Sequence, residues 1–117
     1  RVDKKNIGGT LRTWQWLAPE VILENGEGYG LESDVYSFGV VLWELVSFRY
    51  PYDEFTRNPR YSRRIIDGNG MEIYILNPYD VKQAILNEQL RPSIPDYCNS
   101  DISALIERCW DQNPKKR

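Results

Sequence analysis

The chain of 117 residues carries 15 basic and 17 acidic side chains, and its hydrophobic (41%) and charged (27%) fractions are ordinary for a globular protein. These values argue against wholesale disorder, and a net charge of −2 offers no electrostatic footprint for nucleic acid or for an anionic membrane surface. No apolar run approaches the ~18 residues that a membrane span requires.

The chain contains no histidine, and its two cysteines, Cys98 and Cys109, do not form a close pair. The common zinc sites, His-assisted nucleophiles and histidine general bases are therefore absent, and we expect no metal site. The N-terminal residues contain neither an initiator Met nor an apolar signal region, and the final NPKKR stops abruptly. We interpret both ends as cuts through a longer protein.

The first half of the chain predicts a loop and two helices. Residues 1–13 are polar and aperiodic, and residues 18–23 favour a short helix with Pro19 and Glu20 in its first turn. Ser33 is a suitable N-cap for a helix over 33–48, with Asp34 in its first turn. This helix is apolar on almost every side, which is typical of the centre of a domain.

The second half predicts a long loop followed by two helices. Residues 49–80 hold prolines, a turn at 67–70 and one candidate strand at 71–76. Asp80 is the expected cap of a short helix, and Asn99 or Ser100 the expected cap of the last one. Apolar spacing predicts two buried stripes, Val81, Ala84 and Ile85 on the first helix and Ile102, Leu105, Ile106 and Cys109 on the last.

Three segments carry a family resemblance: TWQWLAPE at 13–20, SDVYSFGVVLWEL at 33–45, and RPSIPDYCNSDISALIERCWDQNPKKR at 91–117. In this order they resemble the second half of a protein-kinase catalytic domain, most closely the tyrosine-kinase-like branch of serine/threonine kinases. The resemblance implies a mainly α fold in which residues 1–117 form a partial, incomplete C-terminal lobe. It leaves a loop or insertion at about 57–79 unexplained.

The resemblance implies that the parent protein transfers phosphate from ATP to serine or threonine of proteins, with ATP and magnesium as cofactors. The chain contains no Gly-rich loop, strand lysine, His-Arg-Asp loop or Asp-Phe-Gly. We therefore expect no catalytic residue here, no bound cofactor, and inactivity of the chain alone. Its expected partners are a protein substrate and the missing N-terminal lobe and catalytic loop of the parent. The resemblance also implies that this part of the protein lies in the cytoplasm, whether or not the parent protein is attached to a membrane.

The resemblance places a substrate-docking segment before Ala18-Pro19-Glu20. Thr13 and Trp16 are its expected substrate-binding residues. A threonine at the position of Thr13 is typical of serine/threonine kinases, where its hydroxyl bonds the catalytic Asp. Thr10 lies in what resembles the activation loop and is the candidate phosphorylation site.

The resemblance also implies four structural residues. Glu20 and Arg117 correspond to a buried ion pair that clamps the substrate-docking segment to the last helices. Asp34 corresponds to a nearly buried carboxylate that reaches the backbone of the catalytic loop. Gly39 corresponds to a small residue that lets its helix pack closely on a neighbour.

Two other interpretations stay open. The chain is alternatively the C-terminal lobe of a pseudokinase that acts as a scaffold or interaction module, and the residues that precede it in the parent would decide this. It is otherwise an unrelated helical module, which a large separation of Glu20 from Arg117 would support. The run Arg57, Arg60, Arg63 and Arg64 favours a solvated loop, with docking of a phosphorylated or acidic partner as the alternative.

The helix expected at 33–48 has more apolar surface than the rest of the chain can cover. We predict that Val35, Phe38, Val41, Leu42 and Leu45 cannot all be buried by the two short helices that follow.

Overall fold

The computed structural model describes residues 14–24 and 28–117. These residues belong to two compact units, one made by the chain up to Pro51 and from Ser93 onward, the other by Tyr52–Pro92. Regular structure in the described residues is mainly helical, with one two-stranded sheet, which agrees with the fold class that the sequence predicts.

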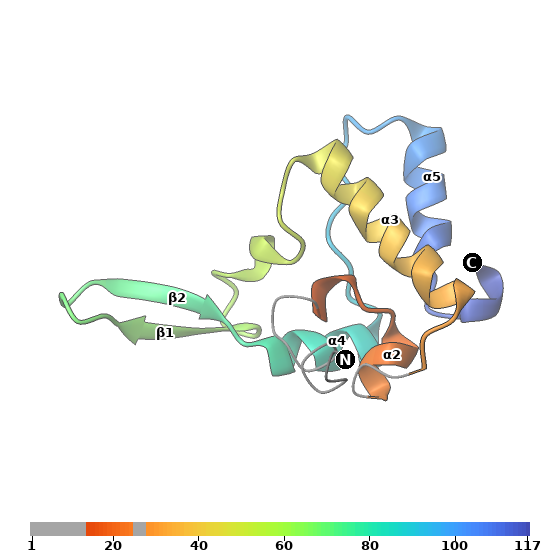
Figure 1. Cartoon of the computed structure of the whole chain (residues 1–117). Coiled ribbons are helices and arrows are strands. Elements are labelled where there is room, and N and C mark those ends of the chain that lie inside the picture. The colour runs from red at the N-terminus through yellow and green to blue at the C-terminus, as the bar shows by residue number, and fades with distance from the viewer. Residues whose placement is uncertain (1–13, 25–27) are drawn as a thin grey trace, which may run out of the picture. The chain divides into compact units, whose positions relative to one another are not determined.

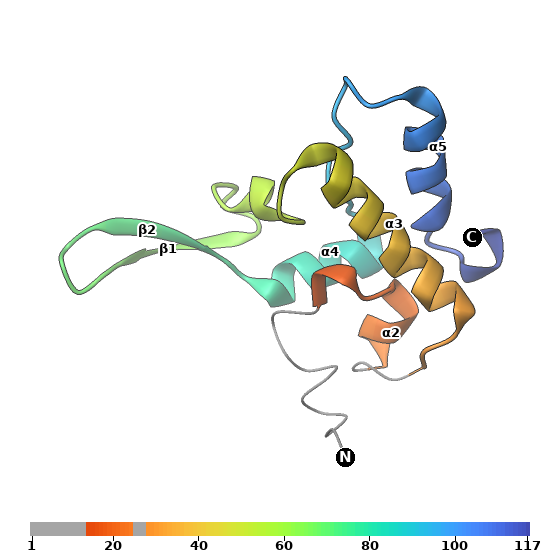
Figure 2. The same ribbon diagram turned by 45° about the horizontal axis from the view of Figure 1, so that its top comes forward.

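The first unit is built around two helices that lie side by side, α3 and α5 (Figures 1 and 2). Its other helical segments are short and flank these two. In chain order the elements are η1 (Trp14–Trp16), α2 (Pro19–Leu23), α3 (Leu31–Ser47), α5 (Ser100–Cys109) and η3 (Pro114–Lys116).

Helix α3 begins two residues earlier than the sequence predicts. Gly30 is its N-cap, and Ser33 lies buried inside the first turn, so the prediction of Ser33 as the cap is wrong. The Ser33 hydroxyl donates to Glu20 in a long-range contact, whereas a capping serine would accept from a backbone amide of the first turn. The helix ends at Phe48, which adopts the left-handed conformation with φ of 56°.

One face of α3 forms the core of this unit. Tyr36, Val40 and Trp43 are buried at helical spacing, and the Trp43 indole donates to the carbonyl of Ser93 at 2.8 Å. At Gly39 the helix touches α5 so closely that a Cβ would lie 2.7 Å from Cys109 Cβ. A side chain at this position would force the two helices apart.

Helix α5 is capped as predicted by Asn99, whose side chain accepts from the amide of Asp101. The predicted stripe is correct only at its C-terminal end, where Ile106 and Cys109 are buried. Ile102 and Leu105 are exposed. The close contact with α3 lies at Cys109, which explains why burial is confined to that end.

The second unit contains η2 (Asp53–Phe55), strands β1 (Ser62–Ile66) and β2 (Glu72–Leu76), and helix α4 (Pro78–Glu88). The two strands pair antiparallel as a hairpin (Figure 1). Strand β2 matches the predicted strand, whereas β1 was not predicted. The predicted turn joins the strands, with Asp67 accepting from the amides of Asn69 and Met71.

Helix α4 is capped by Asn77, which accepts from the amide of Tyr79, with Pro78 as its first residue. The prediction of Asp80 as the cap is therefore wrong, because Pro78 begins the helix before it. The predicted stripe of Val81, Ala84 and Ile85 is buried as expected.

Candidate functional site

The strongest polar constellation of the first unit joins the start of α2 to the end of the chain. Arg117 Nη1 lies 2.6 Å from Glu20 Oε2, and Nη2 lies 3.0 Å from Oε1. The pair is thus bidentate, the geometry that gives a guanidinium–carboxylate contact both strength and orientation. The Arg117 side chain is 0% exposed and that of Glu20 is 30% exposed.

Backbone carbonyls and a ring complete the surroundings of Arg117. Its Nε donates to the Asp111 carbonyl at 2.8 Å, and its Nη1 donates to the Glu32 carbonyl at 3.1 Å. The guanidinium carbon lies 5.0 Å from the centroid of the Tyr36 ring. The buried charge therefore has partners in three segments of this unit: α2, the first half of α3, and the segment after α5.

The same contacts set the charge state of Glu20. Burial raises the pKa of the Glu20 carboxyl, but hydrogen bonds from Arg117, from the backbone and from Ser33, with the positive charge of Arg117, outweigh it and hold the pKa below its usual value. Ser33 contributes a hydrogen bond of 3.1 Å to Oε2. Glu20 therefore stays ionised, which a lasting ion pair requires.

The segment before α2 is bound to α3 through Trp16, whose indole and backbone carbonyl both form hydrogen bonds with side chains of α3. The Trp16 indole donates to Glu44 Oε1 at 2.7 Å, and the Trp16 carbonyl accepts from the Ser37 hydroxyl at 2.7 Å. Its ring meets Tyr50 edge to face at a centroid distance of 5.5 Å. Trp16 is thus held in one orientation with its ring half-buried.

Gln15 presents an acceptor that nothing in the described chain satisfies. The residue is buried, and its Oε1 has no hydrogen-bond partner. A buried amide oxygen normally finds a donor, so the lack of one among the described residues sets Gln15 apart. Sequence reasoning did not single out Gln15 or Ser37, and it expected Ser33 only as a helix cap, because the bonds of Ser33 to Glu20 and of Ser37 to Trp16 join residues distant in the sequence.

The other predicted site residues lie as follows. Gly39 forms the contact with Cys109 described above, and burial raises the pKa of that thiol despite the opposing charge of Arg108. Asp34 is exposed, so the expectation of a nearly buried carboxylate is wrong. Burial raises the pKa of Tyr29, and the negative charge of Asp34 raises it further. Thr10 and Thr13 lie outside the described residues.

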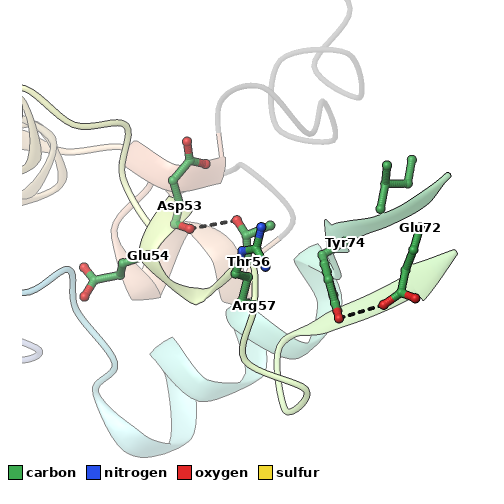
Figure 3. Close-up of a pocket in the computed structure, with 7 residues that line it drawn as sticks. Asp53, Glu54, Thr56, Arg57, Glu72 and Tyr74 are labelled. Atoms are coloured by element: carbon green, nitrogen blue, oxygen red, sulfur yellow. Dashed lines mark hydrogen bonds between the residues drawn. The ribbon is translucent and has the colours of Figure 1, made fainter.

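A cavity of about 650 Å³ in the second unit lies between η2 and β2 (Figure 3). Its polar groups bond one another: Tyr74 donates to Glu72 at 2.9 Å, and the Thr56 hydroxyl donates to the Asp53 carbonyl at 2.7 Å. The Arg57 guanidinium lies 5.4 Å from the Tyr74 ring centroid. The cavity therefore leaves few groups free to orient a ligand.

Among residues 14–24 and 28–117, no group of three or more Cys, Asp or Glu side chains is arranged to hold a metal ion. No helix formed by these residues has the length and apolar character needed to span a membrane.

Comparison with known proteins gives a consistent picture. The sequence model of the family described as protein tyrosine and serine/threonine kinase matches residues 3–117. A probable serine/threonine-protein kinase of Dictyostelium discoideum is 32% identical over 117 residues, 100% of this chain and 6% of that protein. The serine/threonine/tyrosine-protein kinase HT1 of Arabidopsis thaliana is 34% identical over 93% of this chain and 22% of its own length. The dual specificity protein kinase shkA of Dictyostelium discoideum is 36% identical over 97% of this chain and 18% of its own length.

Proposed function

Because the chain belongs to the protein tyrosine and serine/threonine kinase family, we propose that it forms part of a kinase that phosphorylates serine or threonine of protein substrates. Within that kinase it supplies the helical core and the substrate-docking segment. The observation that carries this proposal is the bidentate Glu20–Arg117 pair, since it fastens the end of the segment to the core of the unit.

Rigid placement is what the proposed reaction asks of such a segment. Phosphoryl transfer depends mostly on positioning and on electrostatic stabilisation, so a substrate chain must be held still relative to the transferred group. Three contacts restrain residues 14–20 here: the indole and the carbonyl of Trp16 bond α3, and Glu20 bonds Arg117. The segment can therefore present a fixed surface to a substrate.

Gln15 gives a second argument for the same proposal. Its buried Oε1 accepts no hydrogen bond from the described residues, and the residue directly precedes Trp16. A backbone amide of the substrate, or of the catalytic loop of the same kinase, would satisfy it. Either donor would join this segment to a neighbour during catalysis.

ATP and magnesium belong to the proposed kinase as a whole. Magnesium there would neutralise charge on the transferred phosphoryl group. The described residues of this chain do not fit magnesium, because they contain no carboxylate cluster of the kind that holds a metal ion, and the sequence lacks the Gly-rich loop and strand lysine that hold ATP in kinases. We therefore assign no step of the reaction to a cofactor bound by this chain.

Specificity, partners and location extend the proposal. Thr13 favours serine/threonine substrates over tyrosine, and Thr10 is the phosphorylation site that would order the loop. The partners are a protein substrate and the nucleotide-binding part of the same kinase, in a cytoplasmic setting. The chain spans 6% to 22% of the three relatives above, so these statements concern the longer protein to which we assign it.

The experiment uses the longer protein that contains this chain, with labelled ATP, magnesium and a generic protein substrate, followed by phosphoamino-acid analysis. We expect phosphoserine and phosphothreonine. Gln15→Leu should raise KM for the protein substrate or lower kcat, whereas the exposed variant Glu107→Ala should do neither. Failure of the unaltered protein to transfer phosphate would overturn the proposal and favour the pseudokinase scaffold.

A further inference from the structure

The β1–β2 hairpin leaves one edge of β1 open. The amide of Asn77 bonds the Tyr61 carbonyl and that of Asp67 bonds the Met71 carbonyl, both at 2.8 Å. Because inward and outward residues alternate in an antiparallel pair, Arg63 and Ile65 direct their backbone groups toward β2. Arg64 and Ile66 then direct theirs outward, to the free edge.

The hairpin also has one apolar face that is exposed. Side chains alternate between faces, and the register pairs Ile65 with Ile73 and Arg63 with Ile75. All four of these side chains are exposed, and so is Met71 beyond the strand end. A two-stranded hairpin is marginally stable in water by itself, and an open edge beside such a face favours the addition of another strand.

We propose that β1 pairs antiparallel with β1 of a second copy of this chain, about a two-fold axis at Ile65. In this register Ile65 lies opposite Ile65 of the partner subunit, and Arg64 lies opposite the partner's Ile66. The outward backbone groups of Arg64 and Ile66 then form the new ladder. The product is a four-stranded sheet with the order β2, β1, β1, β2.

Charge selects this register among the symmetric ones. An axis at Ile65 places Arg63 opposite Asp67 of the partner subunit, and the two-fold repeats that contact, so two ion pairs flank the axis. An axis at Arg63 or at Arg64 would place identical arginines opposite each other, which is destabilising. The chosen register also brings Ile73 and Ile65 of both copies into one apolar row.

The arginine run fits a second copy better than an acidic partner. Arg60 forms an ion pair with Glu88, Arg64 lies 3.6 Å from Glu72, and Arg57 lies over the Tyr74 ring. Of the four arginines, Arg63 alone has no such contact within the described part of the chain. Arg63 is therefore available to a partner, and Asp67 lies four residues further along the chain. A surface that carries both charges is complementary to a second copy of itself.

Disulfide cross-linking tests the register directly. Ile65 is a non-hydrogen-bonded position of the new ladder, where Cα atoms of facing residues lie about 4.5 Å apart, within the range that a disulfide spans. We expect Ile65→Cys, in a Cys98→Ser background, to form a covalent dimer on mild oxidation with diamide. Ile73→Cys is the matched control on the same face, because its two copies would lie about 14 Å apart, three strand spacings across the sheet. It should cross-link at least tenfold less.

Sedimentation of the uncross-linked chain gives a second, independent readout. Arg64→Pro removes an outward amide that the β1–β2 ladder does not use, so the hairpin should persist and the dimer dissociate. Arg64→Thr removes the charge but keeps the amide, and should remain dimeric. Equal cross-linking of the Ile65 and Ile73 cysteine variants, or none at Ile65, would overturn the proposal. A monomer whose β1 binds an added acidic peptide would also overturn it.

Discussion

Replacing Glu20 with alanine is the most informative perturbation of the first unit. It removes both carboxylate oxygens from a guanidinium whose side chain is 0% exposed. Among the described residues, that charge then keeps the carbonyls of Asp111 and Glu32 and the Tyr36 ring. Breaking a buried ion pair from one side destabilises a protein by about 3–5 kcal/mol. Because Glu20 is 30% exposed, water reaches part of the pair, and the lower end, about 3 kcal/mol, is expected.

Urea unfolding followed by tryptophan fluorescence measures this loss, since the chain has four tryptophans. Small proteins lose about 1–3 kcal/mol of stability per molar urea, so the midpoint should fall by about 1–3 M. Glu20→Gln keeps the shape and one acceptor and should lose less. Glu107→Ala, at an exposed position of α5, is the matched control and should stay within about 0.5 kcal/mol of the unaltered chain.

The double variant Glu20→Ala, Arg117→Ala decides whether the two residues act as a pair. When both charges are removed together, no charge is left buried alone, so the combined loss should be smaller than the sum by about 1–3 kcal/mol. Losses that add to within about 0.5 kcal/mol would refute the direct contact and the argument built on it.

Three further predictions concern the contact at Gly39, the pKa of Glu20 and the activity of the isolated chain. Gly39→Ala gains about 1 kcal/mol of helix propensity but places a Cβ 2.7 Å from Cys109, so a net loss of about 1–2 kcal/mol in urea unfolding is expected, and a net gain would contradict the close contact. Folding lowers the pKa of Glu20, so the ionised carboxylate stabilises the folded state fully above the ordinary carboxyl pKa of about 4.3. This contribution disappears as pH falls through the lower pKa of the folded state. Glu20→Gln should flatten that part of the plot of stability against pH, and an unchanged plot would count against the lowered pKa. The isolated 117-residue chain should transfer no phosphate from ATP above a blank, since it holds none of the nucleotide-binding and metal-binding motifs.

Local rules predicted those elements whose signals are local. Asn99 caps α5 and the Asp67 turn forms the hairpin, because in each case a side chain bonds an amide two residues on. The close approach of two helices at Gly39 has a local sign too, since a glycine inside an apolar helix needs a packing reason. The family resemblance, rather than periodicity, pointed to Glu20 and Arg117, which are 97 positions apart.

Elements that depend on distant contacts were misjudged. Serine is a residue type that commonly caps helices, but the Ser33 hydroxyl donates to Glu20, 13 positions away, and the helix begins before Ser33. Strand β1 shows no alternation of apolar and polar residues, because it is exposed on both faces, so its sequence resembles a loop. Ser37 acquires its role from α3 packing against η1, which no spacing rule anticipates.

The exposed side of α3 gives the last prediction. Phe38, Val41 and Leu45 recur at helical spacing and are 54%, 43% and 65% exposed, whereas Tyr36, Val40 and Trp43 fill the opposite, buried side. This agrees with the sequence-based expectation that the apolar residues of this helix could not all be buried, while Val35 and Leu42 are half-buried. A surface helix normally turns polar residues outward, so this side is built to be covered.

Covering it would stabilise the chain measurably. Burying a large apolar side chain contributes about 1.5–3 kcal/mol, and roughly half of each of these three remains exposed, which amounts to about 3 kcal/mol in total. Uncovered, the surface should bind a hydrophobic dye at low temperature. Leu45→Glu should reduce that fluorescence severalfold without lowering the urea midpoint, since the residue is 65% exposed. Tyr79→Glu, at an equally exposed position in the first turn of α4, should leave the dye signal unchanged. If the chain binds no dye, or if Leu45→Glu costs as much as a core substitution, this side of α3 is already covered, and the stability gain assigned to a covering segment does not exist.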